Sequence, residues 1–205
     1  QRWVKTDNHN LAAKLALRRH FMGRYHQSGA RVFDACQGDG TIWSRLRQEF
    51  PLASYWGTDL KPQHGRIKID STRILNQPGW GFDVIDIDTY GMPWKHYEAA
   101  LQFGGARMTI FLTLGLVTPG GTTLSTFIRD LFGIEFSTLK IPSAIASKIH
   151  TWATQYCLGI VVTKGYRVIE ALEALNPGGS ARYFGMHLEK LTTKNHESEN
   201  DHRLD

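Results

Sequence analysis

Arg31-Val-Phe-Asp-Ala-Cys-Gln-Gly-Asp-Gly-Thr-Ile-Trp43 is the segment that most strongly predicts how this chain folds. Its apolar start ends in the acid Asp34, and a glycine turn, Gly38-Asp39-Gly40, leads into residues 41–46, which have helical spacing. Glycine is needed where a backbone turns tightly and approaches a ligand closely, because a Cβ would collide. A strand, an acid, a glycine turn and a helix form a nucleotide-shaped pocket at the carboxyl end of the first strand of an α/β sheet. The stretch therefore favours a nucleotide site, and a plain strand-to-helix turn is the alternative.

Further segments also lead into an acid. Residues 54–58 lead into Asp59, about twenty residues past the glycine turn, where an acidic side chain reaches ribose hydroxyls. A carboxylate suits that task because it accepts two hydrogen bonds from a vicinal diol. Residues 66–69 close on Asp70, and residues 82–88 end in Asp86 and Asp88. Any one of these acids could be a helix cap or a solvated strand end, but together they favour a cofactor site.

The glycine turn and the acids together resemble the successive motifs of class I S-adenosylmethionine-dependent methyltransferases, over approximately residues 30–115. The stretch Asp86-Ile-Asp-Thr-Tyr-Gly-Met-Pro93 is similar to the Asp-Pro-Phe/Tyr-Gly-Ser-Pro segment of the tRNA guanine N2-dimethyltransferases. It is more loosely similar to the Asp/Asn-Pro-Pro-Tyr/Phe motif of DNA and RNA amino-methyltransferases. Thr89 stands where those families carry proline.

The resemblance implies S-adenosyl-L-methionine as the cofactor. Asp34 and the glycine turn would hold its methionine end, Asp59 its ribose, and Asp70 with Ser71 its adenine. The predicted cofactor-binding residues are Asp34, Gly38, Asp39, Gly40, Asp59, Leu60, Asp70 and Ser71.

The catalytic residues are expected in the segment that follows the fourth strand. The sulfonium carbon of such a cofactor is already electrophilic, so the protein must orient a nucleophile and take up or share its proton. A carboxylate that accepts a hydrogen bond from an exocyclic amine favours the pyramidal, nucleophilic form of that amine. Asp88 is the first choice for this role, and Asp86, which shares a strand face with it, is the alternate. Tyr90 would stack on the base. No metal is expected, because His96 and His150 lack partners at ligand spacing.

Alternating strand and helix patterns predict an α/β fold, with a Rossmann-like, doubly wound, mostly parallel seven-stranded sheet that ends in an antiparallel hairpin. The expected strands are residues 31–35, 54–58, 66–69, 82–87, 107–114, 166–175 and 181–190, the last two around the turn Asn176-Pro-Gly-Gly-Ser180. The expected helices are residues 41–49 and 93–103, one that ends at about Tyr25 after a cap at Asn8 or Asn10, and one from Pro142 to about Val162.

The expected organisation is an N-terminal helical segment over residues 1–28, a methyltransferase domain over 29–192 and a polar tail over 193–205. Residues 116–142 remain open: their apolar part would be a target-recognition insertion or ordinary packing against the sheet. The 205 residues, 41% of them hydrophobic and 21% charged, suit one globular domain. No apolar run approaches a membrane span and no secretory signal is visible, so a cytoplasmic setting is expected.

The net charge of +5 favours a nucleic-acid partner, because lysine and arginine neutralise phosphates. The excess is concentrated in the N-terminal segment, and a solvated helix face is the alternative. The residues concerned are Lys14, Arg18, Arg19, His20, Arg24 and His26.

The sequence thus favours N-methylation of a nucleic-acid base, in RNA or DNA. Two alternatives stay open: the same chemistry on a small molecule or protein side chain, and a non-catalytic module that binds the cofactor. No membrane partner is expected. With almost no appended domain, the chain would draw substrate grip from a homo-oligomer or another partner.

Overall fold

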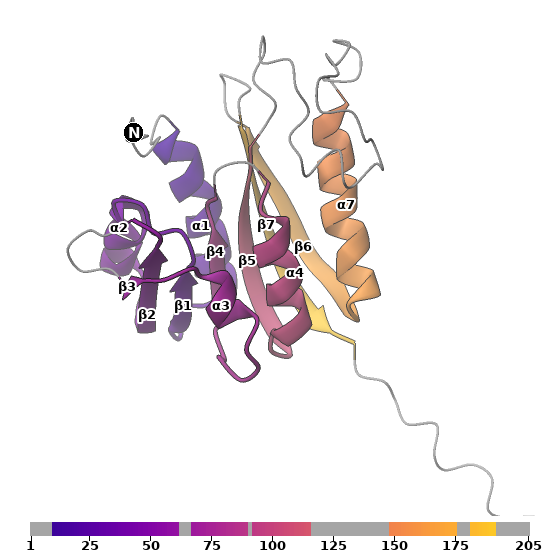
Figure 1. Cartoon of the computed structure of the whole chain (residues 1–205). Coiled ribbons are helices and arrows are strands. Elements are labelled where there is room, and N and C mark those ends of the chain that lie inside the picture. Colours follow the sequence, from indigo (N-terminus) through magenta and orange to yellow (C-terminus); the bar gives the residue numbers. More distant parts are fainter. Residues whose placement is uncertain (1–9, 62–66, 90–91, 116–147, 176–180, 192–205) are drawn as a thin grey trace, which may run out of the picture.

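The computed structural model describes residues 10–61, 67–89, 92–115, 148–175 and 181–191. Seven strands form one sheet in the order β3-β2-β1-β4-β5-β7-β6 (Figure 1). The strands β1 to β5 pair in parallel, and β7 lies antiparallel between β5 and β6. These pairings confirm the predicted mostly parallel sheet and its terminal hairpin. The strands are β1 Ala30–Asp34, β2 Leu52–Asp59, β3 Ile67–Lys68, β4 Val84–Ile87, β5 Arg107–Gly115, β6 Tyr166–Leu175 and β7 Ala181–Lys190.

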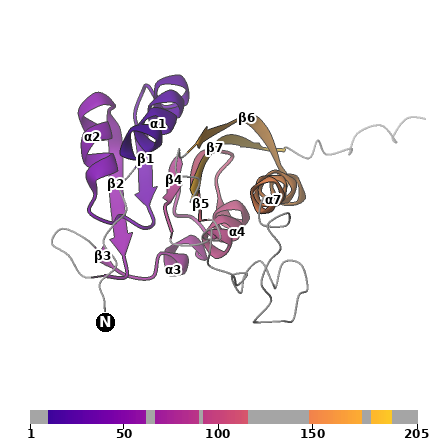
Figure 2. The ribbon, with the colours of Figure 1, turned by 90° about the horizontal axis from the view of Figure 1, so that it is seen from above.

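Helices cover both faces of the sheet (Figure 2). One face carries α1 and α2, and the other carries α3, α4 and α7. Within the part of the chain that the structure describes, no helix is both long and apolar enough to cross a membrane. The helices are α1 Leu11–Tyr25, α2 Thr41–Glu49, α3 Thr72–Leu75, α4 Trp94–Phe103 and α7 Ile149–Thr163.

Strand alternation gives each face its own apolar core, because successive side chains of a strand point to opposite sides. Val32 and Val84 pack with Phe21 of α1 and belong to the core beneath α1 and α2. Phe33 and Ile85 belong to the core beneath α3, α4 and α7. The same alternation places Asp34 and Asp86 on the face that α1 and α2 cover.

Several predicted bounds differ from the structure. The strand β2 is longer than residues 54–58, and β3 shrinks to two residues. In β4, Asp83 lies before the strand because its carboxylate binds the backbone N–H and guanidinium of Arg31. The one-turn helix α3 was not predicted, since four residues are too few for a periodic pattern. The proposed helix start at Pro142 lies outside the described residues.

Candidate functional site

The sheet order brings the predicted acids to one edge. The chain reverses its direction of travel across the sheet between β1 and β4, and ligands bind at such a reversal, beyond the carboxyl ends of the strands. Asp34 ends β1 and pairs in register with both Gly57 of β2 and Asp86 of β4. Asp59 ends β2, and Asp88 follows β4 directly. These four predicted acids therefore lie along the ends of three adjacent strands.

The glycine turn is held by two of the predicted cofactor residues. Gly38 and Gly40 adopt φ values of +57° and +75°, a left-handed conformation that favours glycine. The N–H of Gly38 donates to Oδ2 of Asp59 at 3.0 Å, which ties the turn to the end of β2. Asp39 accepts from the N–H of Thr41 at 3.0 Å and so stabilises the start of α2. Asp59 and Asp39 thus shape the loop.

A residue that sequence reasoning missed supports this turn from below. The side chain of Gln37 packs where a Cβ on Gly57 would lie only 2.5 Å from its Cδ atom. Gly57 therefore makes room for Gln37, and its lack of a side chain was the signal that could have revealed this contact. The amide oxygen of Gln37 is buried and accepts no hydrogen bond from a described residue.

Asp34 lies beneath the surface of the site. It is only 4% exposed, and the hydroxyl of Tyr55 donates to its Oδ2 at 2.8 Å. Burial, and then the neighbouring Asp86, raise the pKa of Asp34 well above its ordinary value. The charged form of this carboxyl is therefore less favourable than that of an exposed aspartate.

Asp86 is fully engaged by two donors on the covering helices. Arg18 of α1 donates from Nε to Oδ2 at 2.6 Å and from a terminal nitrogen to Oδ1 at 2.5 Å. The indole N–H of Trp43 on α2 donates to Oδ2 at 2.7 Å. The residue is 1% exposed. Both oxygens of Asp86 are occupied, so the carboxylate ties α1 and α2 to the sheet.

Among the described residues, the contact to the Asp88 carboxylate is through one oxygen. The ammonium of Lys14 on α1 lies 2.5 Å from its Oδ2, and the Asp88 side chain retains 19% of its exposure. Its Oδ1 accepts no hydrogen bond from any residue that the structure describes. Tyr90, predicted to stack on the base, lies outside the described residues.

Asp70 and Ser71 separate into different surroundings. Asp70 is exposed and accepts from both the N–H and the hydroxyl of Thr72, and these bonds lower its pKa. Ser71 is buried, with its hydroxyl 2.8 Å from Nε2 of His96 on α4. Burial lowers the pKa of His96. The Ser71–His96 contact joins α3 to α4. In the sequence, His96 was considered only as a metal ligand, and no such role was expected for it.

The basic N-terminal segment has other roles than the sequence interpretation gave it. Lys14 and Arg18 are buried, and His26 is buried with its Nε2 2.8 Å from the hydroxyl of Thr109. The remaining members, Arg19, His20 and Arg24, contact glutamates of α2 and β6. These side chains therefore dock α1 onto the rest of the protein. They form neither a free basic patch nor a fully solvated helix face.

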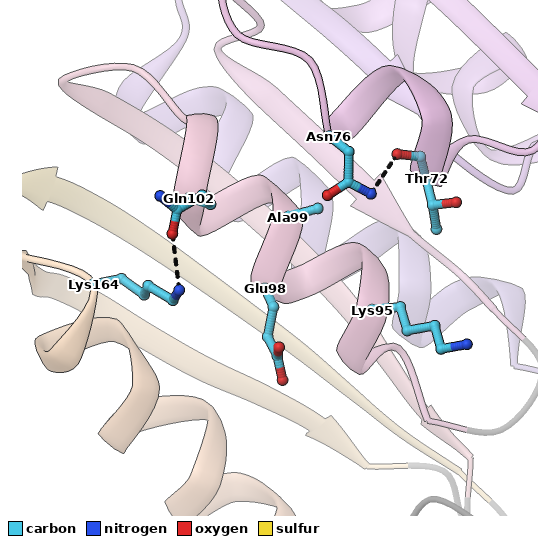
Figure 3. A pocket seen from close by; sticks show the side chains of 7 residues that line it. All are labelled: Thr72, Asn76, Lys95, Glu98, Ala99, Gln102 and Lys164. Carbon is cyan, nitrogen blue, oxygen red and sulfur yellow. Dashed lines mark hydrogen bonds between the residues drawn. The ribbon is translucent and has the colours of Figure 1, made fainter.

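A separate groove lies between α3, α4 and the end of α7, on the opposite face of the sheet (Figure 3). Its polar groups largely engage one another or their neighbours: Lys164 donates to Gln102 at 2.9 Å, and Glu98 accepts from Tyr156 at 2.6 Å. None of the predicted site residues lines it. Its lining residues are Thr72, Asn76, Lys95, Glu98, Ala99, Gln102 and Lys164.

No protein-family model matches the sequence, and no curated protein matches it. Solved structures do resemble it. Trm1 from Pyrococcus horikoshii, in complex with S-adenosyl-L-methionine, superposes with a TM-score of 0.64 at 13% identity, over 91% of this chain and 57% of that one. A putative rRNA-methylase from Clostridium thermocellum gives 0.55 at 12% identity, over 87% and 96%. The 1,6-didemethyltoxoflavin-N1-methyltransferase of Burkholderia thailandensis gives 0.54 at 11% identity, over 90% and 80%.

At these identities the likeness shows the fold. The chain has the fold of the class I S-adenosylmethionine-dependent methyltransferases, as its motifs suggested. It spans 57% of the length of the Trm1 chain, so it corresponds to part of that protein.

Proposed function

We propose that the protein is an S-adenosylmethionine-dependent methyltransferase that methylates an amine nitrogen of a nucleic-acid base. One observation carries this proposal: Asp88, with one carboxylate oxygen fixed and the other without a partner among the described residues, lies at the same sheet edge as the Gly38–Gly40 turn. A carboxylate acceptor beside a glycine turn is the pair of features that an amine methyltransferase requires.

The residues at the edge fit the proposed cofactor. Two left-handed glycines leave positions 38 and 40 of the turn without a Cβ atom, and the side chain of Leu60 is 67% exposed beside the partly exposed Asp59. An exposed leucine offers an apolar surface for an adenine ring, while a carboxylate accepts from ribose hydroxyls. The buried amide oxygen of Gln37 lies directly below with no partner among the described residues. When bound, the cofactor supplies an electrophilic methyl carbon.

We assign the other cofactor residues by the same reasoning. The glycine turn and the start of α2 lie at the proposed methionine end, with Asp59 fixing the turn and Asp39 fixing the helix start. Asp34 forms the floor below them. Asp70 and Ser71 hold the start of α3 in place for the adenine.

Of the two candidate acceptors, Asp88 fits the reaction and Asp86 does not. Both oxygens of Asp86 already accept hydrogen bonds, and the residue is closed to solvent. Oδ1 of Asp88 can accept from the N–H of an amine, which keeps the nitrogen lone pair directed at the methyl carbon. The carboxylate then takes up or shares the proton that the amine loses. Tyr90 remains the proposed stacking partner of the base.

A nucleic-acid acceptor is supported by charge. The chain carries a net charge of +5. Lys68 ends β3 and Lys95 is the second residue of α4, so both lie near the carboxyl edge. Both are exposed and form no ion pair within the part of the chain that the structure describes. Such lysines are available to phosphates.

A small-molecule acceptor is the second candidate, because the toxoflavin-type N1-methyltransferase is about as similar in structure as the rRNA-methylase. The experiment is transfer of a tritiated methyl group from S-adenosylmethionine to unfractionated tRNA, rRNA, DNA and free nucleosides. We expect label in a base of RNA or DNA, with a rate that falls as salt rises. Label in free nucleosides alone favours the small-molecule reading, and cofactor binding without any transfer favours a non-catalytic module.

A further inference from the structure

We propose that Lys14 is a positioning residue: its ammonium orients the carboxylate of Asp88 so that one oxygen stays open to the amine. This inference rests on the proposed function, because it takes Asp88 as the group that accepts the amine N–H. Lys14 itself touches neither the amine nor the cofactor in this account.

Two ion pairs join α1 to β4 in matching register. Lys14 and Arg18 are four residues apart, so they share a face of α1 and are separated by about 6 Å along the helix. Asp86 and Asp88 are two residues apart on one strand face, a separation of about 6.6 Å. The near match lets Arg18 bind Asp86 while Lys14 binds Asp88. The helix is thereby docked so that Lys14 has a defined place over the loop.

The two ion pairs differ in the number of carboxylate oxygens that the cation contacts. The guanidinium of Arg18 is a planar fork and takes both oxygens of Asp86. The ammonium of Lys14 is a point charge and takes only Oδ2 of Asp88. A lysine at this position therefore fixes the carboxylate without occupying it fully.

The ammonium of Lys14 is itself held in place. Its Nζ lies 5.0 Å from the centre of the Tyr183 ring on β7, and its side chain is only 6% exposed. Arg18 also donates to the backbone carbonyl of Lys14 at 3.1 Å, which steadies that turn of α1. Burying an unpaired ammonium group raises the free energy of the folded state. The ion pair with Asp88 therefore stabilises Lys14 in its buried position.

Two other roles would give different results. If Lys14 only ties α1 to the sheet, any cation that keeps the ion pair restores activity. If Lys14 instead blocks Asp88 until substrate displaces it, its removal raises the rate. The substitutions Lys14→Met and Lys14→Arg separate these roles. Arg19→Met is the matched control, because Arg19 lies on the same helix as Lys14 and forms an exposed pair with Glu49 of α2.

The experiment measures tritiated methyl transfer to unfractionated tRNA, together with cofactor affinity and the melting temperature. For Lys14→Met we expect kcat to fall about ten- to a hundredfold, with the KM for tRNA and the affinity for S-adenosylmethionine unchanged. Lys14→Arg should keep the melting temperature and still lower kcat, because its fork would take both oxygens of Asp88. Arg19→Met should change none of these quantities.

A double-substitution cycle completes the test. In an Asp88→Asn background, Lys14→Met should lower kcat no further, because Lys14 acts through Asp88. Independent losses, full activity of Lys14→Arg, or a higher kcat in Lys14→Met would each overturn the proposal. If Lys14→Met does not fold, Lys14→Arg alone decides between a tie and a positioning role. A wild-type protein that transfers no methyl group to any acceptor overturns the proposed function instead, and the inference falls with it.

Discussion

Asp34 and Asp86 are register partners on adjacent strands, and both are buried beneath α1 and α2. Two carboxylates so placed cannot both be charged without compensation. Arg18 and Trp43 donate directly to Asp86, whereas the described side-chain donor to the Asp34 carboxyl is the hydroxyl of Tyr55. Burial and Asp86 accordingly raise the pKa of Asp34 well above its ordinary value.

Because the two carboxyls have different partners, Asp86→Asn and Asp34→Asn should lower the free energy of unfolding by different amounts. Asp86→Asn leaves the guanidinium of Arg18 buried without its counter-charge, so we expect a loss of about 3–5 kcal/mol in the free energy of unfolding. Asp34→Asn removes a carboxyl whose charged form burial already disfavours, and we expect a much smaller change. Urea unfolding at neutral pH measures both, with Glu49→Gln as an exposed control that should leave stability unchanged. Equal losses at the two buried sites would refute this account of the pair.

The buried His187 predicts a loss of stability in mild acid. Burial, followed by repulsion from His26 and Arg107, lowers its pKa from 6.5 to about 4. As pH falls below 6.5, His187 binds a proton in the unfolded chain, whereas in the folded chain it binds one only at about pH 4. The free energy of unfolding should therefore fall with pH across this window.

His187→Gln should reduce that slope, measured by urea unfolding between pH 7 and pH 4 (the range set by the shift). His26 and His96, whose pKa values burial also lowers, would leave part of it in place. His20→Gln, at an exposed position on α1, is the matched control. An unchanged slope in His187→Gln would show that this histidine does not resist protonation.

Asp59 predicts a specific effect on cofactor affinity. Its carboxylate accepts from the N–H of Gly38 and from that of Lys61, so Asp59→Ala should loosen the glycine turn as well as remove a ribose acceptor. A lost hydrogen bond to a charged group corresponds to about a tenfold or greater loss of affinity. Isothermal titration with S-adenosylmethionine measures it, and Glu173→Gln, on the hairpin, serves as the control. An affinity equal to that of the wild type would remove Asp59 from the site.

Gly57 predicts a defect that a second substitution repairs. A Cβ at this position would lie 2.5 Å from Cδ of Gln37, so Gly57→Ala should displace that side chain and disturb the turn above it. Overpacking of this kind costs about 1–3 kcal/mol. The double variant Gly57→Ala with Gln37→Ala has room for the methyl group and should recover the melting temperature. Failure of the double variant to recover would place the cause elsewhere.

The sheet was predictable because strand alternation and acid-ended strands are local patterns. Residues 41–49 were predicted as a helix and form α2 with those bounds. The run Glu170-Ala-Leu-Glu-Ala-Leu175 has helical propensity but forms a strand, because it pairs with β7. The helix α3 escaped prediction because a single turn has no period to detect.

The site was predictable only in part, because roles depend on partners that are distant in sequence. The sequence could place Asp86 and Asp88 on one strand face but could not show that Arg18 closes one of them. Lys14 and Arg18 were interpreted as part of a basic segment. Their burial could not be predicted from the sequence, because their acidic partners lie far away in the chain. Gln37 was passed over because its significance comes from Gly57 on the neighbouring strand.

The most direct test compares single-turnover transfer of a tritiated methyl group to unfractionated tRNA by the wild type and by Asp88→Asn, with cofactor affinity measured in parallel. We predict that Asp88→Asn binds S-adenosylmethionine with the affinity of the wild type. Its rate of methyl transfer should fall about a hundredfold or more, because the carboxylate acts on the amine alone. Transfer at the wild-type rate by Asp88→Asn would contradict the central claim that Asp88 accepts the amine proton.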